Sequence, residues 1–173
     1  GELTPRMWDL KLGDKMSIRP RAKGIFTQDK KMHHHFMLST VTGVAPTMSM
    51  VRQYLHDGGA EGDTGKRVFY IVYGASYVDE LTYDVEFAEL AEKHSDVVKF
   101  IPTISRPTEE RNSSWTGTTG RVNTIAEEYL AKFDLSKGDT KVYACGHPGM
   151  IEEMKEKLLP KGWNFIEERF WKP

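Results

Sequence analysis

The chain has 173 residues, of which 39% are hydrophobic and 28% are charged, the balance of a globular domain that can bury a core. A net charge of −1 gives no basic excess for nucleic-acid binding, and no apolar run approaches the roughly 20 residues of a membrane-spanning helix. The N-terminus lacks a secretory-signal pattern and the single Cys145 excludes an intramolecular disulfide, so we expect a cytoplasmic protein that binds neither nucleic acid nor membrane.

Residues 1–30 differ in character from the rest of the chain. Residues 1–31 carry a net charge of +4 and the remainder a net charge of −5, an asymmetry that either steers an acidic partner toward this end or belongs to an ordinary solvated surface. Alternation of apolar and polar residues predicts a short strand over Lys15–Arg19, and Ile25–Thr27 predicts a second. Because these strands have no pairing partner here, we expect them to belong to a β-rich unit that begins upstream of Gly1.

The next unit is a strand, a tight loop and a helix. The apolar run Phe36–Leu38 follows three histidines, which point to opposite faces of a strand and therefore mark its start rather than a metal site. The small-residue loop 39–46 leads into a helix with one apolar face, formed by Met48, Val51 and Leu55. Because the first turn of a helix leaves N–H groups unpaired and Gly43 permits close backbone approach, this loop is either a phosphate site or a plain connector.

The remaining residues continue the alternation of strands and helices. Further strands are predicted over 67–73, 97–104, 141–145 and 163–169, and helices over 83–93, 122–133 and 150–159. In the first of these helices we expect Val85, Leu90 and Ala91 to face inward. The pattern predicts an α/β fold with a doubly wound, five-stranded parallel sheet over residues 31–173.

The loops that follow the predicted strands share a composition. They are rich in glycine, serine and threonine, and they span residues 39–46, 74–77, 105–120 and 146–149. Ligands of doubly wound sheets bind beyond the C-terminal ends of the strands, where these loops must gather. The sequence therefore predicts one ligand site at this edge of the sheet.

Motifs in these loops resemble those of the ferredoxin/flavodoxin–NADP reductase family, flavoenzymes with an FAD-binding β-barrel followed by a nucleotide-binding α/β domain. Thr40-Val-Thr-Gly-Val-Ala-Pro46 is similar to the family's pyrophosphate loop, and Cys145-Gly-His-Pro-Gly-Met150 is similar to its nicotinamide loop. Ser105-Arg106 resembles the pair that meets the 2′-phosphate of NADP. Glu168-Arg-Phe-Trp171 resembles the C-terminal motif of bacterial members, and Gly1-Glu-Leu-Thr4 the element at the FAD pyrophosphate.

This resemblance covers the whole chain and implies its organisation. Residues 12–14 and 24–27 match the end of the family's barrel, so residues 1–30 are expected to be the last strands of an incomplete FAD-binding β-barrel. Residues 31–173 are then the NAD(P)-binding domain.

The resemblance also implies roles for individual residues. Cys145 is expected to contact the nicotinamide, and Glu168 to relay protons or orient the nicotinamide, as the catalytic pair. Guanidinium and hydroxyl groups suit a phosphate on the ribose. The expected cofactor-binding residues are Gly1, Thr4, Thr40, Thr42, Gly43, Pro46, Ser76, Ser105, Arg106, Arg111, Arg121, Gly146, His147, Pro148, Met150, Phe170 and Trp171.

Several of these residues have a second interpretation. Cys145 is also typical of a buried apolar residue, and Glu168 of a strand-end salt bridge. The aromatic pair at 170–171 either covers the flavin or anchors the C-terminus in a core, and Trp115 either packs over the adenine or pins its own loop.

Two departures from the family pattern shape the functional expectation. Val41 stands where the family has a glycine, and the main flavin motif, Arg-x-Tyr-Ser/Thr, would lie upstream of Gly1. We therefore expect part of a longer reductase that uses NADP rather than NAD, holds FAD in its full-length form and exchanges electrons with a ferredoxin- or flavodoxin-like carrier. The alternatives are the reductase component of an oxygenase system and a catalytically silent nucleotide-binding module that docks on a separate flavin subunit.

Overall fold

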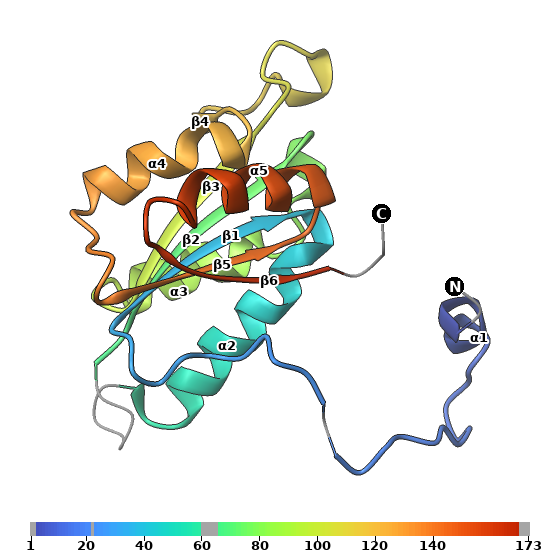
Figure 1. Ribbon diagram of the computed structural model, residues 1–173. Coiled ribbons are helices and arrows are strands. Elements are labelled where there is room, and N and C mark those ends of the chain that lie inside the picture. Colours follow the sequence, from blue (N-terminus) through green and yellow to red (C-terminus); the bar gives the residue numbers. More distant parts are fainter. Residues whose placement is uncertain (1–2, 22, 60–65, 170–173) are drawn as a thin grey trace.

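Figure 1 shows the computed structural model, which describes residues 3–21, 23–59 and 66–169. Six parallel strands form one sheet in the order β4-β3-β2-β1-β5-β6. The strands are β1 (His34–Thr40), β2 (Val68–Ala75), β3 (Val98–Ile104), β4 (Thr118–Thr119), β5 (Thr140–Cys145) and β6 (Asn164–Glu168). The helices are α1 (Leu3–Trp8), α2 (Ala45–His56), α3 (Asp84–Lys93), α4 (Val122–Lys132) and α5 (Pro148–Leu158), with 3₁₀ turns η1 (Val41–Val44), η3 (Val78–Glu80) and η4 (Glu110–Asn112).

Helices cover both faces of the sheet, as the unbroken apolar character of its central strands requires. Successive residues of β1 point to opposite faces, so Phe36 and Leu38 join the core under α4 and α5 while Met37 joins the core under α2 and α3. These two layers are visible on either side of the sheet in Figure 1. The doubly wound parallel sheet predicted from the sequence is therefore confirmed.

The five predicted strands are present, and a sixth, β4, extends the sheet by two residues. β4 pairs with the end of β3 inside the segment expected to be a loop, and two threonines in a polar stretch carry no alternation that predicts a strand. In α3 the prediction for Val85 is wrong, because its side chain is 67% exposed and Phe87 is buried instead. Leu90 and Ala91 do pack toward the core, three and four residues after Phe87 on the same face, whereas Val85 lies on the opposite face.

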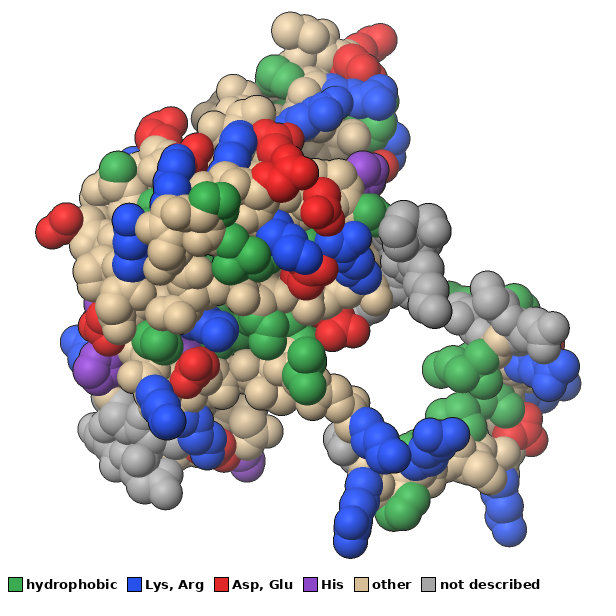
Figure 2. All heavy atoms as spheres, viewed as in Figure 1, with side chains coloured by type: hydrophobic (Ala, Val, Ile, Leu, Met, Phe, Trp, Pro, Cys, Tyr) green, Lys and Arg blue, Asp and Glu red, His purple; other side chains and the backbone are tan. Residues whose placement is uncertain are grey.

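The strands predicted in the N-terminal region are wrong. Neither Lys15–Arg19 nor Ile25–Thr27 forms a strand or pairs with a strand among the described residues. A strand without a partner leaves its backbone N–H and C=O groups unpaired, which disfavours it. This segment, which we call the N-terminal arm (residues 3–25 as described), stands away from the body in Figures 1 and 2 and carries exposed apolar and basic side chains. Trp8 is 84% exposed. The assignment of residues 1–30 to a barrel stays a prediction.

No helix among the described residues has the length and apolar character needed to cross a membrane.

The topology fixes where loops converge. From β1 the chain proceeds through β2 and β3 to β4 on one side, and β5 and β6 lie on the other side of β1. The strand order therefore reverses between β1 and β5, the place at which ligands bind in doubly wound sheets. Because all strands are parallel, their C-terminal ends share one edge.

Candidate functional site

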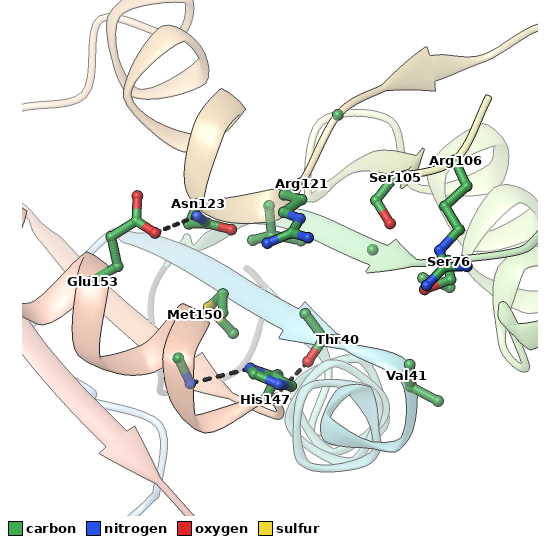
Figure 3. Close-up of a pocket in the computed structure, with 15 residues that line it drawn as sticks. Thr40, Val41, Ser76, Ser105, Arg106, Arg121, Asn123, His147, Met150 and Glu153 are labelled. Atoms are coloured by element: carbon green, nitrogen blue, oxygen red, sulfur yellow. Dashed lines mark hydrogen bonds between the residues drawn. The ribbon is translucent and has the colours of Figure 1, made fainter. Parts of the chain in front are cut away.

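A cavity of about 430 Å³ opens at the C-terminal edge of the sheet. Figure 3 shows Ser105 and Arg106 on one side of it and His147 and Met150 on the other, with Thr40 at the end of β1 between them. The lining residues are Thr40, Val41, Gly74, Ala75, Ser76, Ser105, Arg106, Gly120, Arg121, Val122, Asn123, His147, Gly149, Met150 and Glu153. The loops that follow β1, β2, β3, β4 and β5 thus contribute to one site.

The structure brings most of the predicted site residues to this edge. Those that line the cavity are Thr40, Ser76, Ser105, Arg106, Arg121, His147 and Met150. Thr42, Gly43, Pro46, Gly146 and Pro148 lie in the same loops or helix starts without lining the cavity, and Arg111 lies in η4. Gly1, Phe170 and Trp171 lie outside the described residues, as does the side chain of Thr4.

The loop after β1 and the loop after β5 are interlocked. The Thr40 hydroxyl accepts a hydrogen bond from the His147 N–H at 2.7 Å. A Cβ on Gly43 would lie 2.3 Å from the Cys145 carbonyl oxygen, and one on Gly146, whose φ is +134°, would lie 2.1 Å from the Thr40 hydroxyl oxygen. Glycine is therefore required at both positions, because any side chain would push the two loops apart.

The N-termini of α4 and α5 line the cavity, and α2 begins just after the loop that contributes Val41. His147 caps α5, its Nδ1 accepting from the Gly149 N–H at 3.1 Å, and Arg121 and Asn123 flank the first residue of α4. The first turns of α2, α4 and α5 contain no acidic residue. Because helix N-termini carry partial positive charge and unpaired N–H groups, this edge is suited to an anionic ligand such as a pyrophosphate.

Asn112 fixes the loop that carries Ser105 and Arg106. Its side chain is 1% exposed, and its Oδ1 accepts from the Val78 N–H at 2.9 Å. Its Nδ2 donates to the Ser76 carbonyl at 3.0 Å and to the Arg106 carbonyl at 2.8 Å. One buried amide therefore joins the loop after β2 to the loop after β3. Trp115 pins the same loop further along, its Nε1–H donating to the Thr118 carbonyl at 2.9 Å.

Tyr77 organises the charged groups beside the cavity. The Arg106 guanidinium donates to the Tyr77 hydroxyl at 3.0 Å, and Arg111 stacks on the Tyr77 ring at 4.0 Å. The Tyr77 hydroxyl donates to Glu109 at 2.7 Å, and this bond together with Arg106 holds the pKa of the Glu109 carboxyl below its usual range. Arg111 is paired with Asp79 at 2.6 Å.

Cys145 lies at the end of β5, beneath the backbone of Gly43. Its side chain is 1% exposed, and burial together with the charge of Glu168 raises the pKa of the thiol to about 12. A protonated buried thiol cannot act as a nucleophile or base near neutral pH. Glu168 is the register partner of Cys145, and at this strand end Glu167, not Glu168, forms the ion pairs seen among the described residues, with Lys155 and Arg169.

Sequence reasoning missed Asn123 and Glu153, which lie on the same wall of the cavity. The Asn123 amide donates to the Glu153 carboxylate at 2.5 Å, and Lys157 pairs with the same carboxylate at 2.6 Å. The position of each residue in its predicted helix could have indicated both. Asn123 is in the first turn of α4, and Glu153 is one turn after Met150 on α5, so both helices present these positions to the strand-end edge. No cluster of metal-ligating side chains occurs among the residues the structure describes.

Comparisons with known proteins place this geometry among nucleotide-binding oxidoreductases. A family model described as "Oxidoreductase NAD-binding domain" matches residues 37–156. A flavodoxin/ferredoxin–NADP reductase of Escherichia coli (strain K12) is 27% identical over 159 residues, covering 88% of this chain and 60% of that protein. An NADH-cytochrome b5 reductase 1 of Coccidioides immitis is 25% identical over 164 residues, covering 94% of this chain and 51% of that protein.

The fold also resembles a solved structure. A ferredoxin NADP⁺ reductase from Neisseria gonorrhoeae, solved with bound FAD and NADP, superposes with a TM-score of 0.66 at 20% sequence identity, covering 87% of this chain and 62% of that one. The chain thus spans between about half and two thirds of the length of these three proteins.

Proposed function

We propose, from the premise that this chain belongs to the oxidoreductase NAD-binding domain family, that it is the nucleotide-binding part of a flavin-dependent reductase. In this proposal the full-length protein transfers hydride between NADP(H) and FAD and passes electrons to or from a one-electron carrier such as a ferredoxin or flavodoxin. The relatives named flavodoxin/ferredoxin–NADP reductase and the order of the quoted motifs along this chain support it.

The observation that carries the proposal is the convergence of the strand-end loops and the starts of α4 and α5 on one cavity. The residues present fit a dinucleotide, since Gly43, which has no room for a side chain against the Cys145 carbonyl, leaves backbone in the turn between β1 and α2. Thr40 and the N-termini of α2 and α5 would hold the pyrophosphate. Ser105, Arg106 and Arg121 would hold the ribose phosphate at the far side of the cavity.

The nicotinamide end belongs near Met150 and the end of β5. When bound, the nicotinamide and flavin supply the hydride chemistry, and the chain binds, orients and excludes water. Cys145 stays protonated and buried and therefore serves as a neutral contact below the loop. The net charge of +4 on residues 1–31 supports an acidic carrier as the electron-transfer partner.

Titration of the chain with NADP⁺ in a calorimeter tests the nucleotide-binding part of the proposal. We expect binding in the wild type and a loss of about tenfold or more in affinity for Arg106→Ala, because a charged hydrogen bond to phosphate is worth about 1.5–3 kcal/mol. Arg52→Ala is the matched control, since Arg52 is an exposed arginine on α2 whose partner is Glu86. Equal affinities in the two variants would contradict the placement of the phosphate.

The redox part of the proposal needs the full-length protein. A flavin absorbance spectrum and turnover of NADPH with a dye acceptor are expected. A purified full-length protein that binds nucleotide but holds no flavin would contradict the reductase proposal and favour the silent nucleotide-binding module.

A further inference from the structure

Arg106 is already paired with a carboxylate of its own loop. Its Nη1 donates to Glu109 Oε1 at 3.2 Å and to the Tyr77 hydroxyl at 3.0 Å, while that hydroxyl donates to Glu109 Oε2 at 2.7 Å. The three side chains form a closed triangle beside the cavity. A phosphate that binds Arg106 must therefore compete with Glu109 for the guanidinium.

We propose that Glu109 is a specificity-determining residue that weakens the binding of a 2′-phosphorylated dinucleotide relative to its unphosphorylated counterpart. The inference rests on the proposed function, since it concerns the same cavity. A 2′-phosphate carries about −1.5 to −2 charges near neutral pH and would meet the carboxylate at close range. A ribose hydroxyl, in contrast, can donate to that carboxylate without displacing it from Arg106.

The backbone around Glu109 holds the carboxylate in this position. The Glu109 N–H donates to the Arg106 carbonyl at 3.2 Å, and the Asn112 N–H donates to the Glu109 carbonyl at 2.9 Å. The side-chain Nδ2 of Asn112 also donates to the Arg106 carbonyl and so fixes the same turn. Because the turn itself is fixed, Arg106 is released from Glu109 only when one of the two side chains rotates.

The other charges near the cavity do not perform this role. Arg111 is neutralised by Asp79 at 2.6 Å and does not line the cavity. Arg121 lines the cavity and forms no ion pair with any residue that the structure describes, so its attraction for a phosphate is independent of Glu109. Of the two arginines that line the cavity, Arg106 is thus paired with a carboxylate of its own loop, whereas Arg121 interacts electrostatically with Glu153 on α5.

The test is calorimetric titration of the chain with NADP⁺ and NAD⁺ in three forms: wild type, Glu109→Gln and Glu110→Gln. Glutamine keeps the length of the side chain and a hydrogen bond to Tyr77 but removes the charge that holds Arg106. We expect Glu109→Gln to tighten NADP⁺ binding by about threefold to tenfold and to change NAD⁺ binding by less than about twofold, as one exposed ion pair and one like-charge repulsion would give. Glu110→Gln, an equal charge change at the exposed neighbouring residue, should change both affinities by less than about twofold.

A second comparison removes Arg106. In an Arg106→Ala background the effect of Glu109→Gln on NADP⁺ affinity should shrink to about twofold or less, since the competition for that guanidinium is gone and only the direct repulsion between Glu109 and the phosphate remains. An effect of undiminished size in this background, or an unchanged ratio of NADP⁺ to NAD⁺ affinity in Glu109→Gln, would overturn the inference while leaving the proposed function intact. Absence of binding of either dinucleotide to the wild type and to Glu109→Gln would overturn both.

Discussion

Val41 adopts a backbone conformation that its residue type disfavours. Its φ is +45°, in the left-handed region, where a β-branched side chain costs on the order of 1–2 kcal/mol. The bonds around it hold it there, because Thr40 is tied to His147 and Gly43 is pressed against the Cys145 carbonyl. Strain of this kind concentrates at functional sites, and here it lies on the lining of the cavity.

Replacing Val41 with glycine should relieve this strain. We expect Val41→Gly to leave the free energy of unfolding unchanged or raise it by up to about 1 kcal/mol, since relief of strain exceeds or offsets the backbone entropy of glycine. Removing the branched side chain from the cavity should also strengthen NADP⁺ binding. Denaturant unfolding and calorimetry measure the two effects.

Val85→Gly is the control for this prediction. Val85 is exposed in the first turn of α3, where glycine relieves no strain, so Val85→Gly should destabilise the protein by up to about 0.5–1 kcal/mol without changing nucleotide affinity. Equal destabilisation by the two substitutions would show that Val41 is not strained.

At the scale of elements, the site depends on how two loops are joined. Asn112 links the loop after β2 to the loop after β3 through three hydrogen bonds made by one buried side chain. Removing it would leave the Val78 N–H and the carbonyls of Ser76 and Arg106 without these partners. Ser105 and Arg106 would then lose their position at the cavity.

Asn112→Ala is expected to lower the free energy of unfolding by about 2–4 kcal/mol, because each unsatisfied buried group costs about 1–3 kcal/mol. It should also weaken NADP⁺ binding although Asn112 does not line the cavity. Thermal unfolding and calorimetric titration check both expectations. Asn164→Ala is the control: Asn164 makes one exposed bond to the Lys137 carbonyl, and its loss should cost less than about 1 kcal/mol. An Asn112→Ala protein as stable as this control would contradict the role of the buried amide.

At the scale of the whole molecule, the chain preceding β1 is tied to the edge of the sheet opposite the cavity. His35 is fully buried, its Nε2–H donating to the Met32 carbonyl at 3.1 Å and its Nδ1 accepting from the Tyr143 hydroxyl at 3.2 Å. The same hydroxyl accepts from the Asp29 N–H at 2.8 Å, and Phe26 packs edge-on against the Tyr143 ring. These contacts suit a neutral imidazole.

Burial, and then the charge of Arg67, lower the pKa of His35 to about 4; the bond to the Met32 carbonyl and the charge of Asp29 oppose the shift, and His34 adds to it. The unfolded chain therefore binds more protons than the folded chain between pH 6.5 and about 4. We expect the contribution of His35 to the free energy of unfolding to be fully present above pH 6.5, and the free energy of unfolding to fall by about 3 kcal/mol as the pH drops to about 4.

Denaturant unfolding across this pH range, with His35→Gln, measures the effect. The free energy of unfolding of His35→Gln should depend much less on pH in this range. His56→Gln, at an exposed position at the end of α2, should keep the pH dependence of the wild type. A slope that is the same in all three proteins would assign the acid sensitivity to other groups.

The sequence predicted the parts of the fold that depend on local pattern. Buried parallel strands such as β2 are apolar almost throughout, which made the five main strands recognisable, and the resemblance to ferredoxin/flavodoxin–NADP reductases is confirmed by the family model and by relatives of that name. The prediction of N-terminal strands was wrong because strand formation depends on pairing partners that a local sequence pattern cannot reveal. The prediction that Val85 is buried was wrong because an apolar residue type alone does not determine which face of a helix is buried.

The candidate site was predictable to a similar depth. The gathering of the strand-end loops at one edge followed from the topology, and Gly43 and Gly146 were expected there as cofactor-binding residues, whereas their role in joining two loops was not predicted. The left-handed Val41, the buried Asn112 and the pairing of Arg106 with Glu109 did not, because each depends on the path that two separate loops take through space. Exposed glutamates in a polar loop give no signal of which arginine they will meet.

The central claim is that a dinucleotide binds where the loops after β1, β3 and β5 meet. Amide chemical shifts of the isotopically labelled chain, recorded as NADP⁺ is added, test it most directly. We predict saturable shifts at Thr40, Ser105 and His147, none at His34 and Thr140 at the opposite edge, and loss of the shifts in Gly43→Ala, whose added Cβ would meet the Cys145 carbonyl oxygen. Shifts confined to the opposite edge, or no shifts at saturating NADP⁺ and NAD⁺, would contradict the account.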